Sequence, residues 1–510
     1  MSWSSLPPEL QIEVCRMLLE PESNSLADVG IPDLMTRPRM LSTCAAVCQG
    51  WQEYFEKENF KRLILHQGDV SQFGKILACH QRTSFVRWIW LRIELPTYDC
   101  SRCGTPESTD EDVANKYIFT NAVWDLLGIL STWPRNKEIE QERRGLTLEL
   151  SVHSPSDTDH YCQDLFVRAN DTAWSLHTPP PRVYKDEFHR WENGHPTRAV
   201  ENDALLRVFG HPRGLRFDLR APSSRRWRRV LPKVGVVKSF TIRRQFFRHF
   251  SVAKALVPII ESLNRLVRFE YEPWRGIDTA SFKGKDIRDE EHQQLFEVLK
   301  SKRSLRFISF FEDVNPTYHR RNQHKRANRT LGQTLARSSR NLECLHAAMG
   351  VDAQDFFFAF LPEATKPPRD MRWRNLERLS LYTSHLTLEG QDRLLCSAAL
   401  AAKVMPNIKI FELWTARPQQ PCIFIYGLKK GGKPQISLDS SWGARFSGQA
   451  VELWEEKAKL DNTRHKLSVR YWDYDPCGAP SHVVVIEHLV VGKQLLNETS
   501  LQQLLNLLQR

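Results

Sequence analysis

The chain has 510 residues, of which 41% are hydrophobic and 26% are charged, and its formal net charge is +12. This composition is typical of a globular protein with a large core and more than one domain. The positive charge permits contact with nucleic acid, acidic membranes or acidic proteins. It does not choose among them, because 60 acidic residues are interspersed with the basic ones.

Cysteine usage and hydropathy exclude two classes of protein. Eleven cysteines is an odd number, they have no regular spacing, and the chain does not begin with the charged and apolar regions of a signal peptide. No uninterrupted apolar run approaches the roughly 18 residues that span a bilayer. We therefore expect a soluble protein of the cytoplasm or nucleus, without a membrane partner.

The N-terminal stretch predicts two short amphipathic helices. Ser5 suits a helix N-cap, and Pro7 and Pro8 suit a first helical turn. Apolar side chains then recur at helical spacing: Leu10, Val14, Met17 and Leu18. A second helix over residues 41–56 would carry five side chains on one face: Cys44, Val47, Cys48, Trp51 and Phe55. So small a bundle needs a partner or the rest of the chain to bury its apolar faces.

Three sub-motifs of this stretch occur in a distinctive order. Leu6-Pro7-Pro8-Glu9-Leu10 is followed by Val47-Cys48-x-x-Trp51 and then by Asn59-Phe60-x-x-Leu63. The stretch resembles the F-box, the module by which substrate receptors dock on the Skp adaptor of cullin-RING ubiquitin ligases. The resemblance implies an adaptor-binding strip of eight residues: Leu6, Pro7, Leu10, Ile12, Val14, Cys48, Trp51 and Leu63.

This sequence departs from the F-box pattern at two places. The link over residues 21–40 is longer than usual, and Gln49 stands where the family usually has a basic residue. Gln49 leaves the apolar strip intact. Pattern alone also permits a simple helical cap with no docking role.

The following region alternates between strand and helix patterns. Residues 86–93 predict a β-strand, and residues 112–130 predict a helix that Trp133-Pro134 ends. A half-buried strand follows from alternating apolar residues: Leu146, Leu148, Leu150 and Val152. Residues 154–196 predict a loop or insertion, whose aromatic residues indicate that it packs on the protein: Trp174, Tyr184, Phe188 and Trp191.

A weak internal repeat marks the C-terminal part. Six short apolar-x-x-apolar-x-apolar segments start at residues 237, 266, 305, 342, 376 and 408. Helical patterns fill gaps between them, at residues 253–263, 289–300, 326–338 and 388–404. One strand and one helix per unit resembles a leucine-rich-repeat horseshoe. The steps are irregular and longer than usual, so an ordinary α/β domain is the alternative.

Beyond Leu413 the pattern changes. Four strands are predicted, at residues 422–426, 435–438, 467–471 and 483–486, with helices over 449–459 and 500–508. These elements would cap the repeat stack. The predicted fold class is α/β (α+β), in three parts: an F-box-like helical module over 1–66, a connecting α/β region with a Pro-rich loop over 67–200, and a repeat-like α/β receptor domain with its cap over 201–510.

Candidate chemical sites are weak. Residues 427–433 match the spacing of a phosphate-binding loop, but Pro434 replaces the magnesium-binding Ser or Thr, which favours a glycine-rich hairpin turn. Cys100 and Cys103 have the spacing of half a zinc site, and the nearest downstream candidates are only His153, His160 and Cys162. No nucleophile motif and no metalloprotease motif occurs. We expect no catalytic residues, no metal and no cofactor.

Two arginine-rich clusters, at residues 225–229 and 319–326, have the charge to bind phosphates or to act as a nuclear address. No aromatic ladder accompanies them. A solvated loop or a contact surface for acidic proteins is therefore the favoured interpretation, and nucleic acid is not expected as the main partner.

Together these patterns predict a non-catalytic substrate receptor of a Skp-cullin-F-box type ubiquitin ligase, similar to filamentous-fungal F-box proteins with divergent C-terminal domains. The N-terminal module would bind the Skp-type adaptor, and the C-terminal domain would bind an unknown protein substrate. If the six short strands lie side by side, six residues would line an exposed concave face: Arg268, Glu270, Arg306, Ser309, Arg378 and Ser380. A nucleic-acid or phosphate-binding protein that uses the arginine clusters is the alternative, and an enzyme ranks third.

Overall fold

The structure is a computed structural model. It describes residues 6–18, 36–78, 80–134, 145–163, 185–193, 195–211, 213–226, 229–277, 284–315, 318–319, 328–361, 371–417, 420–429, 432–461, 465–473 and 482–508.

A long mixed sheet organises this part of the chain, and its strands follow one another in sequence order. Neighbouring strands are parallel except at β12–β13 and β13–β14. The twelve strands are β1 (Arg62–His66), β2 (Trp88–Glu94), β3 (Leu146–His153), β7 (Val237–Ile242), β8 (Arg268–Tyr271), β9 (Phe307–Phe311), β10 (Cys344–Ala348), β11 (Arg378–Tyr382), β12 (Ile410–Arg417), β13 (Gln420–Lys429), β14 (Lys433–Ser440) and β15 (Ser468–Asp473). The predicted α/β class is confirmed at this level.

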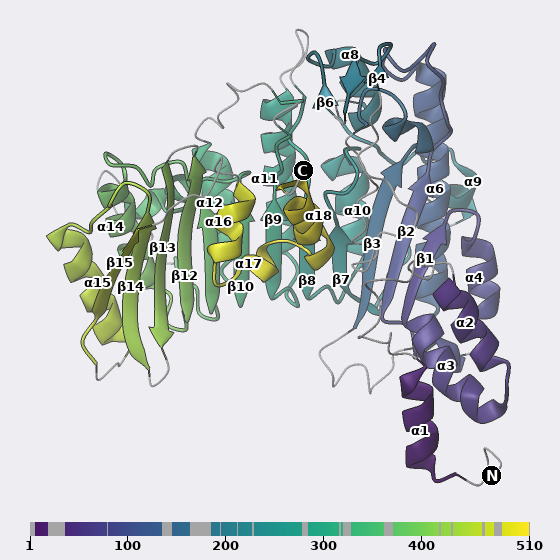
Figure 1. Cartoon of the computed structure of the whole chain (residues 1–510), viewed down its shortest axis with the longest axis horizontal. Helices are drawn as coiled ribbons and strands as arrows, with labels where there is room; N and C mark the ends of the chain where they lie inside the picture. Colours follow the sequence, from purple (N-terminus) through teal and green to yellow (C-terminus); the bar gives the residue numbers. More distant parts are fainter. Residues whose placement is uncertain are drawn as a thin grey trace.

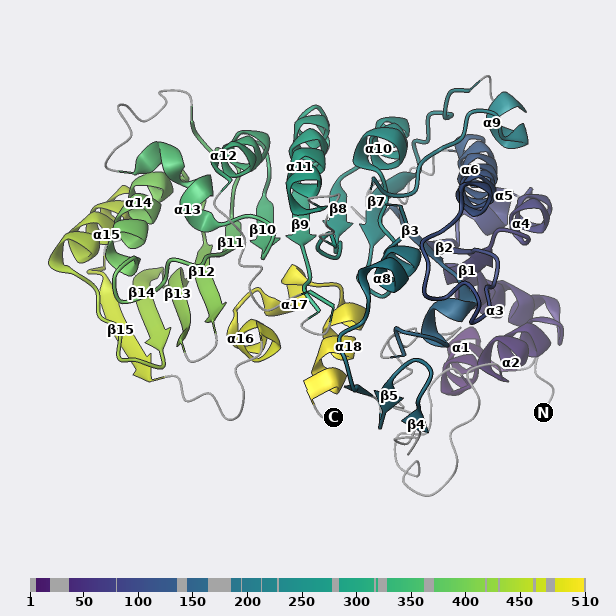
Figure 2. The ribbon, with the colours of Figure 1, turned by 90° about the horizontal axis from the view of Figure 1, so that it is seen from above.

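Because each parallel neighbour requires a crossover, helices return along the sheet between strands. Figure 2 shows the strands as a curved row with these helices on its outer side. They are α6 (Thr109–Ser131), α10 (Val257–Ser262), α11 (Gly284–Lys300), α12 (Arg329–Ser338), α14 (Gln391–Ala402) and α15 (Gly448–Leu460). Within the residues described, no helix is both long enough and apolar enough to cross a membrane.

Local sequence explains where these helices begin. Ser108 and Glu111 form a reciprocal capping box at the start of α6, and three acidic residues occupy its first turn. Asn328 caps α12, and Ser447 caps α15, each by accepting a backbone N–H from the first turn. Crossover helices therefore carry their own start signals in the sequence.

The main core lies between the sheet and the outer helices. One fully buried residue from each of the six predicted repeat strands pairs in register with the next: Phe240, Phe269, Ile308, Leu345, Leu379 and Phe411. The six short segments do lie side by side, as predicted.

Shorter elements connect or flank these layers. They are α4 (Val70–Ile76), α5 (His80–Thr83), η2 (Pro155–Thr158), α8 (Asn202–Phe209), α9 (Pro222–Arg226), η3 (Val252–Leu256), α13 (Ala353–Phe356) and η4 (Phe358–Phe360). A separate antiparallel sheet contains β4 (Lys185–Asp186), β5 (Trp191–Glu192) and β6 (His195–Pro196). It lies within the predicted 154–196 loop. Trp191 is buried there and Phe188 is exposed, whereas Trp174 and Tyr184 lie outside the described residues.

The inner face of the middle strands, from β9 to β13, is covered by the C-terminal helices α16 (His482–His488), α17 (Gly492–Leu495) and α18 (Glu498–Leu508). Figure 1 shows them in yellow in front of the middle strands. They form a second core with Phe311, Trp414 and Ile423. These helices extend across the sheet, whereas the sequence predicted a cap at its end.

Three predicted elements need correction. The strand predicted at 483–486 is helix α16. The helix predicted over 41–56 is two helices that meet near the extended residue Cys48: α2 (Thr36–Ala45) and α3 (Gln49–Lys61). Strand β3 is buried on both faces instead of one, because Glu149 pairs with Arg243 and Ser151 accepts a hydrogen bond from the Trp90 indole N–H.

Candidate functional site

The N-terminal helices form a small bundle with a core of its own. Helix α1 (Pro8–Met17) and α2 pack on α3, which leads directly into β1. Cys15, Leu41 and Phe55 are buried together, and Trp51 packs against Phe55 with 5.5 Å between ring centroids. Figure 1 shows the bundle in purple at the β1 end of the sheet. Strand β1 itself pairs with β2, so the sheet begins inside the predicted 1–66 module.

Helix α1 and its C-cap residue expose five large apolar side chains. They are Leu10 (51% exposed), Ile12 (55%), Val14 (38%), Met17 (64%) and Leu18 (39%). The cause is local: the bundle is small enough that Cys15 alone supplies the buried contact of α1. Leu10, Val14, Met17 and Leu18 share one side of α1 at helical spacing, and we call these four residues the α1 strip, whereas Ile12 lies on the opposite side. Exposed apolar residues gathered on one side of a helix mark interaction surfaces in soluble proteins.

The eight predicted adaptor-binding residues fall into two groups. Pro7, Leu10, Ile12, Val14 and Cys48 are exposed, whereas Leu6, Trp51 and Leu63 are half-buried. Leu10 and Val14 lie on the same side of α1, Ile12 lies on the opposite side, and Cys48 is at the α2–α3 junction beside exposed Val47. Leu63 lies on β1 and packs against the main core.

The six predicted substrate-binding residues are not a continuous exposed face. Arg268, Arg306 and Arg378 are half-exposed, but Glu270, Ser309 and Ser380 are buried. The prediction of exposure is wrong for these last three, and Ser309 shows why: its hydroxyl donates a 2.6 Å hydrogen bond to the Leu495 carbonyl of α17. Arg378 donates to the Gln494 side chain at 3.1 Å.

Buried charged groups beneath helices α16 to α18, which we call the C-terminal cover, help to hold these helices on the sheet. The Glu272 carboxylate accepts hydrogen bonds from the Asn497 backbone at 2.7 Å and the Ser500 hydroxyl at 2.5 Å. Burial nevertheless raises the pKa of Glu272 to about 7. Nearby, Arg275 pairs with Glu312 at 3.1 Å. These contacts satisfy Glu272, Arg275 and Glu312 within the protein.

The structure also shows where the glycine-rich segment and the two basic clusters lie. Strands β13 and β14 form a β-hairpin, with Lys429 opposite Lys433 and Gly432 at a φ of +74°, so the hairpin prediction is confirmed, and residues 430 and 431 lie outside the described part. In the first basic cluster, Arg226 is exposed and lies 3.4 Å from Asp125. In the second, His319 is buried with Nε2 2.9 Å from the Arg275 carbonyl, and residues 320–327 lie outside the described part.

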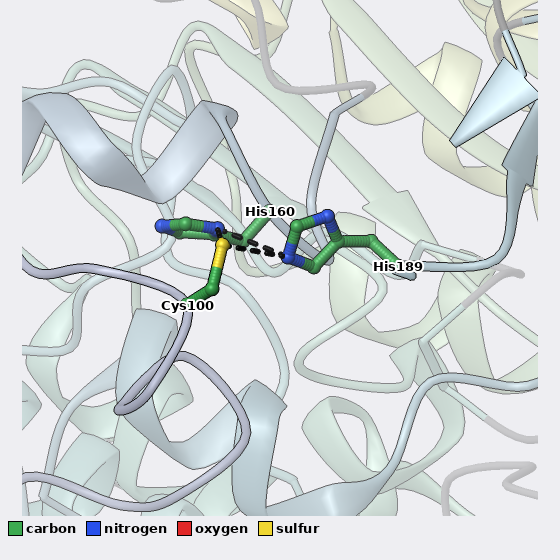
Figure 3. Close-up of side chains that lie close together, drawn as sticks. All are labelled: Cys100, His160 and His189. Atoms are coloured by element: carbon green, nitrogen blue, oxygen red, sulfur yellow. Dashed lines mark hydrogen bonds between the residues drawn. The ribbon is translucent and has the colours of Figure 1, made fainter. Parts of the chain in front are cut away.

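A cysteine–histidine group lies near the carboxyl ends of β2 and β3. Cys100, His160 and His189 converge there, as Figure 3 shows, and Cys103 is adjacent. Of the downstream residues named as possible partners of the Cys100–Cys103 pair, only His160 contributes. His189 was missed, because it lies in the 154–196 segment, where hydropathy has no regular period. A histidine 29 residues beyond His160 gives no spacing signal of its own.

A family model described only as a family of unknown function (DUF6546) matches residues 300–497. That range contains strands β9 to β15 and the covering helices α16 and α17. No curated protein matches the chain.

Proposed function

We propose that this protein is the substrate-receptor subunit of a Skp-cullin-F-box type ubiquitin ligase. The exposed α1 strip is the observation that carries the proposal, because it contains Leu10 and Val14, two of the residues that the F-box resemblance assigns to adaptor binding. The helices of the bundle bury Cys15, Leu41 and Phe55 and leave the apolar residues of α1 available to a partner. A Skp-type adaptor is the partner that the motif order implies.

The remainder of the chain acts as the receptor. Parallel strands in chain order, with crossover helices along one face, support a degenerate repeat-like arrangement. Such a domain holds a bound substrate at a fixed distance from the ligase, so ubiquitin transfer is promoted by proximity and the chain needs no catalytic group of its own.

Substrate docking is best placed along the edge of the sheet that is formed by the beginnings of its parallel strands. Arg268 and Arg378 begin β8 and β11, and Arg306 immediately precedes β9, so all three lie at the edge where the parallel strands start. They are half-exposed and alternate with acidic groups, as in the 3.7 Å pair between Arg306 and Glu343. This edge suits a protein segment of mixed charge.

The adaptor proposal is tested by placing charge in the α1 strip. Leu10→Asp and Val14→Asp should each weaken binding of a purified Skp-type adaptor at least tenfold, since a desolvated apolar anchor contributes roughly 2 kcal/mol or more. Titration calorimetry measures the affinity. Circular dichroism should be unchanged, because both side chains are exposed.

Leu460→Asp is the matched control. Leu460 is 61% exposed at the end of α15, at the opposite end of the sheet. The control should bind the adaptor like the wild type. Equal affinity of all four proteins, or no adaptor binding by the wild type, would contradict the proposal.

A further inference from the structure

We propose that Cys100, Cys103, His160 and His189 bind a structural zinc ion. The Cys100 Sγ lies 3.6 Å from His160 Nδ1 and 3.7 Å from His189 Nε2, and the two nitrogens are 3.1 Å apart. A tetrahedral site with Zn–S of about 2.3 Å and Zn–N of about 2.0–2.1 Å requires sulfur–nitrogen edges of about 3.6 Å and a nitrogen–nitrogen edge of about 3.3 Å. Three corners of the tetrahedron are therefore in place (Figure 3).

Cys103 is the nearest candidate for the fourth corner, and its Sγ must turn toward the ion, because among these four residues only the Cys100, His160 and His189 donor atoms lie within 4.8 Å of one another. The Cys103 Sγ is 3.7 Å from His189 Nε2 and 3.2 Å from the Cys100 carbonyl oxygen, to which it donates. A tight turn keeps the two cysteines together: the backbone N–H groups of Arg102 and Cys103 both donate to the Asp99 carbonyl at 3.1 Å. Loss of the thiol proton on metal binding releases Cys103 from its carbonyl partner and turns the sulfur into a ligand.

The outer hydrogen bonds orient both imidazoles for metal binding. His189 Nδ1 lies 2.6 Å from the Asp186 carboxylate, and His160 Nε2 lies 3.3 Å from the Tyr98 carbonyl. Both partners can only accept, so these two nitrogens carry the protons. In the neutral rings, the two remaining nitrogens present lone pairs to each other at 3.1 Å. A cation between them converts this repulsion into coordination, and such outer partners are typical of zinc-binding histidines.

The donor set and its burial indicate the metal and the role. Two thiolates and two imidazoles in tetrahedral array favour zinc. Cys103, His160 and His189 are each less than 10% exposed, and four protein ligands leave no position for a substrate. The ion would link three segments: the turn before α6, the segment after η2, and the connection between β4 and β5, which contains His189. Its role is structural.

Metal content of the purified full-length chain tests the site. Protein expressed in medium that contains zinc should hold about one zinc ion per chain, as measured by inductively coupled plasma mass spectrometry. Exchange into Co²⁺ should give the visible absorption of a tetrahedral site with two thiolates. Cys100→Ser combined with His189→Ala should lose both signals. Cys344→Ser, which removes a half-buried cysteine on β10, should retain them.

Asp186→Asn keeps all four ligands and therefore tests the hydrogen bond that orients the His189 imidazole without removing a ligand. It should weaken zinc binding about 10- to 100-fold in competition with a chelator, because the histidine loses its charged partner. Wild-type protein that takes up neither zinc nor cobalt would overturn the proposal. So would full retention of zinc by the Cys100→Ser/His189→Ala variant, or cobalt spectra unchanged by Cys103→Ser.

Discussion

At the scale of single residues, Glu412 shows how a buried carboxyl group links stability to pH. It lies on β12, is fully buried, and accepts a 2.7 Å hydrogen bond from the Val490 backbone N–H. Burial raises the pKa of Glu412 to about 7 in the folded protein. The folded state therefore binds a proton that the unfolded chain releases at its ordinary pKa of 4.5.

The sign of the pH dependence follows. The stabilisation by protonated Glu412 is complete below pH 4.5, declines as the pH rises, and is lost above about 7. Glu412→Gln stays neutral and keeps an acceptor for Val490. Relative to the wild type, it should gain about 3 kcal/mol in free energy of unfolding between pH 4.5 and pH 8.

Urea unfolding at several pH values measures this difference. The comparison must be made against the wild type, because other buried groups titrate as well: burial lowers the pKa of His346 to about 4, which destabilises the protein as the pH falls. Glu487→Gln, at an exposed position of α16, is the control. A constant difference between Glu412→Gln and the wild type across this range would contradict the assignment.

At the scale of elements, the C-terminal helices are held on the sheet by apolar packing as well as by hydrogen bonds. Leu495 of α17 is fully buried in the second core. Leu495→Ala should cost about 2–5 kcal/mol, the usual range for a buried leucine. Protease cleavage within residues 482–508 should become faster, because helices α16 to α18 would separate from the sheet before the rest of the protein unfolds.

Val490→Ala is the control for this prediction. Val490 follows α16 and is 59% exposed, so its truncation should change the free energy of unfolding by less than about 0.5 kcal/mol. Equal effects of the two substitutions would show that the cover is not held by the Leu495 contact.

At the scale of the whole molecule, the N-terminal bundle has a core separate from the main core, which predicts that the bundle is a unit of stability of its own. The bundle core of Cys15, Leu41 and Phe55 does not join the main core of the sheet. Phe55→Ala should therefore cost about 3–5 kcal/mol within the bundle and abolish adaptor binding. Hydrogen exchange should rise across α1 to α3 and stay slow in β7 to β12, whereas faster exchange throughout would show that the chain unfolds as one unit.

Much of the fold follows from local signals in the sequence. The six apolar-x-x-apolar-x-apolar segments predicted β7 to β12, because a strand buried on the sheet needs that alternation, and Ser108 with Glu111 marks the start of α6. The Leu-Pro-Pro-Glu-Leu segment likewise predicted α1. Only short-range chemistry was needed at these positions.

Tertiary structure alone decided which face of the sheet is covered and which residues form the cysteine–histidine group. The run Val483–Ile486 has strong β propensity, yet it is helical because it packs on a finished sheet, and the same packing buries Ser309 and Ser380. His189 meets Cys100 across 89 positions of sequence only when the small sheet folds back toward the strand ends. Sequence by itself determines which residues favour strand, helix or turn. Which faces are covered, and which distant side chains meet, depends on long-range packing that no local pattern encodes.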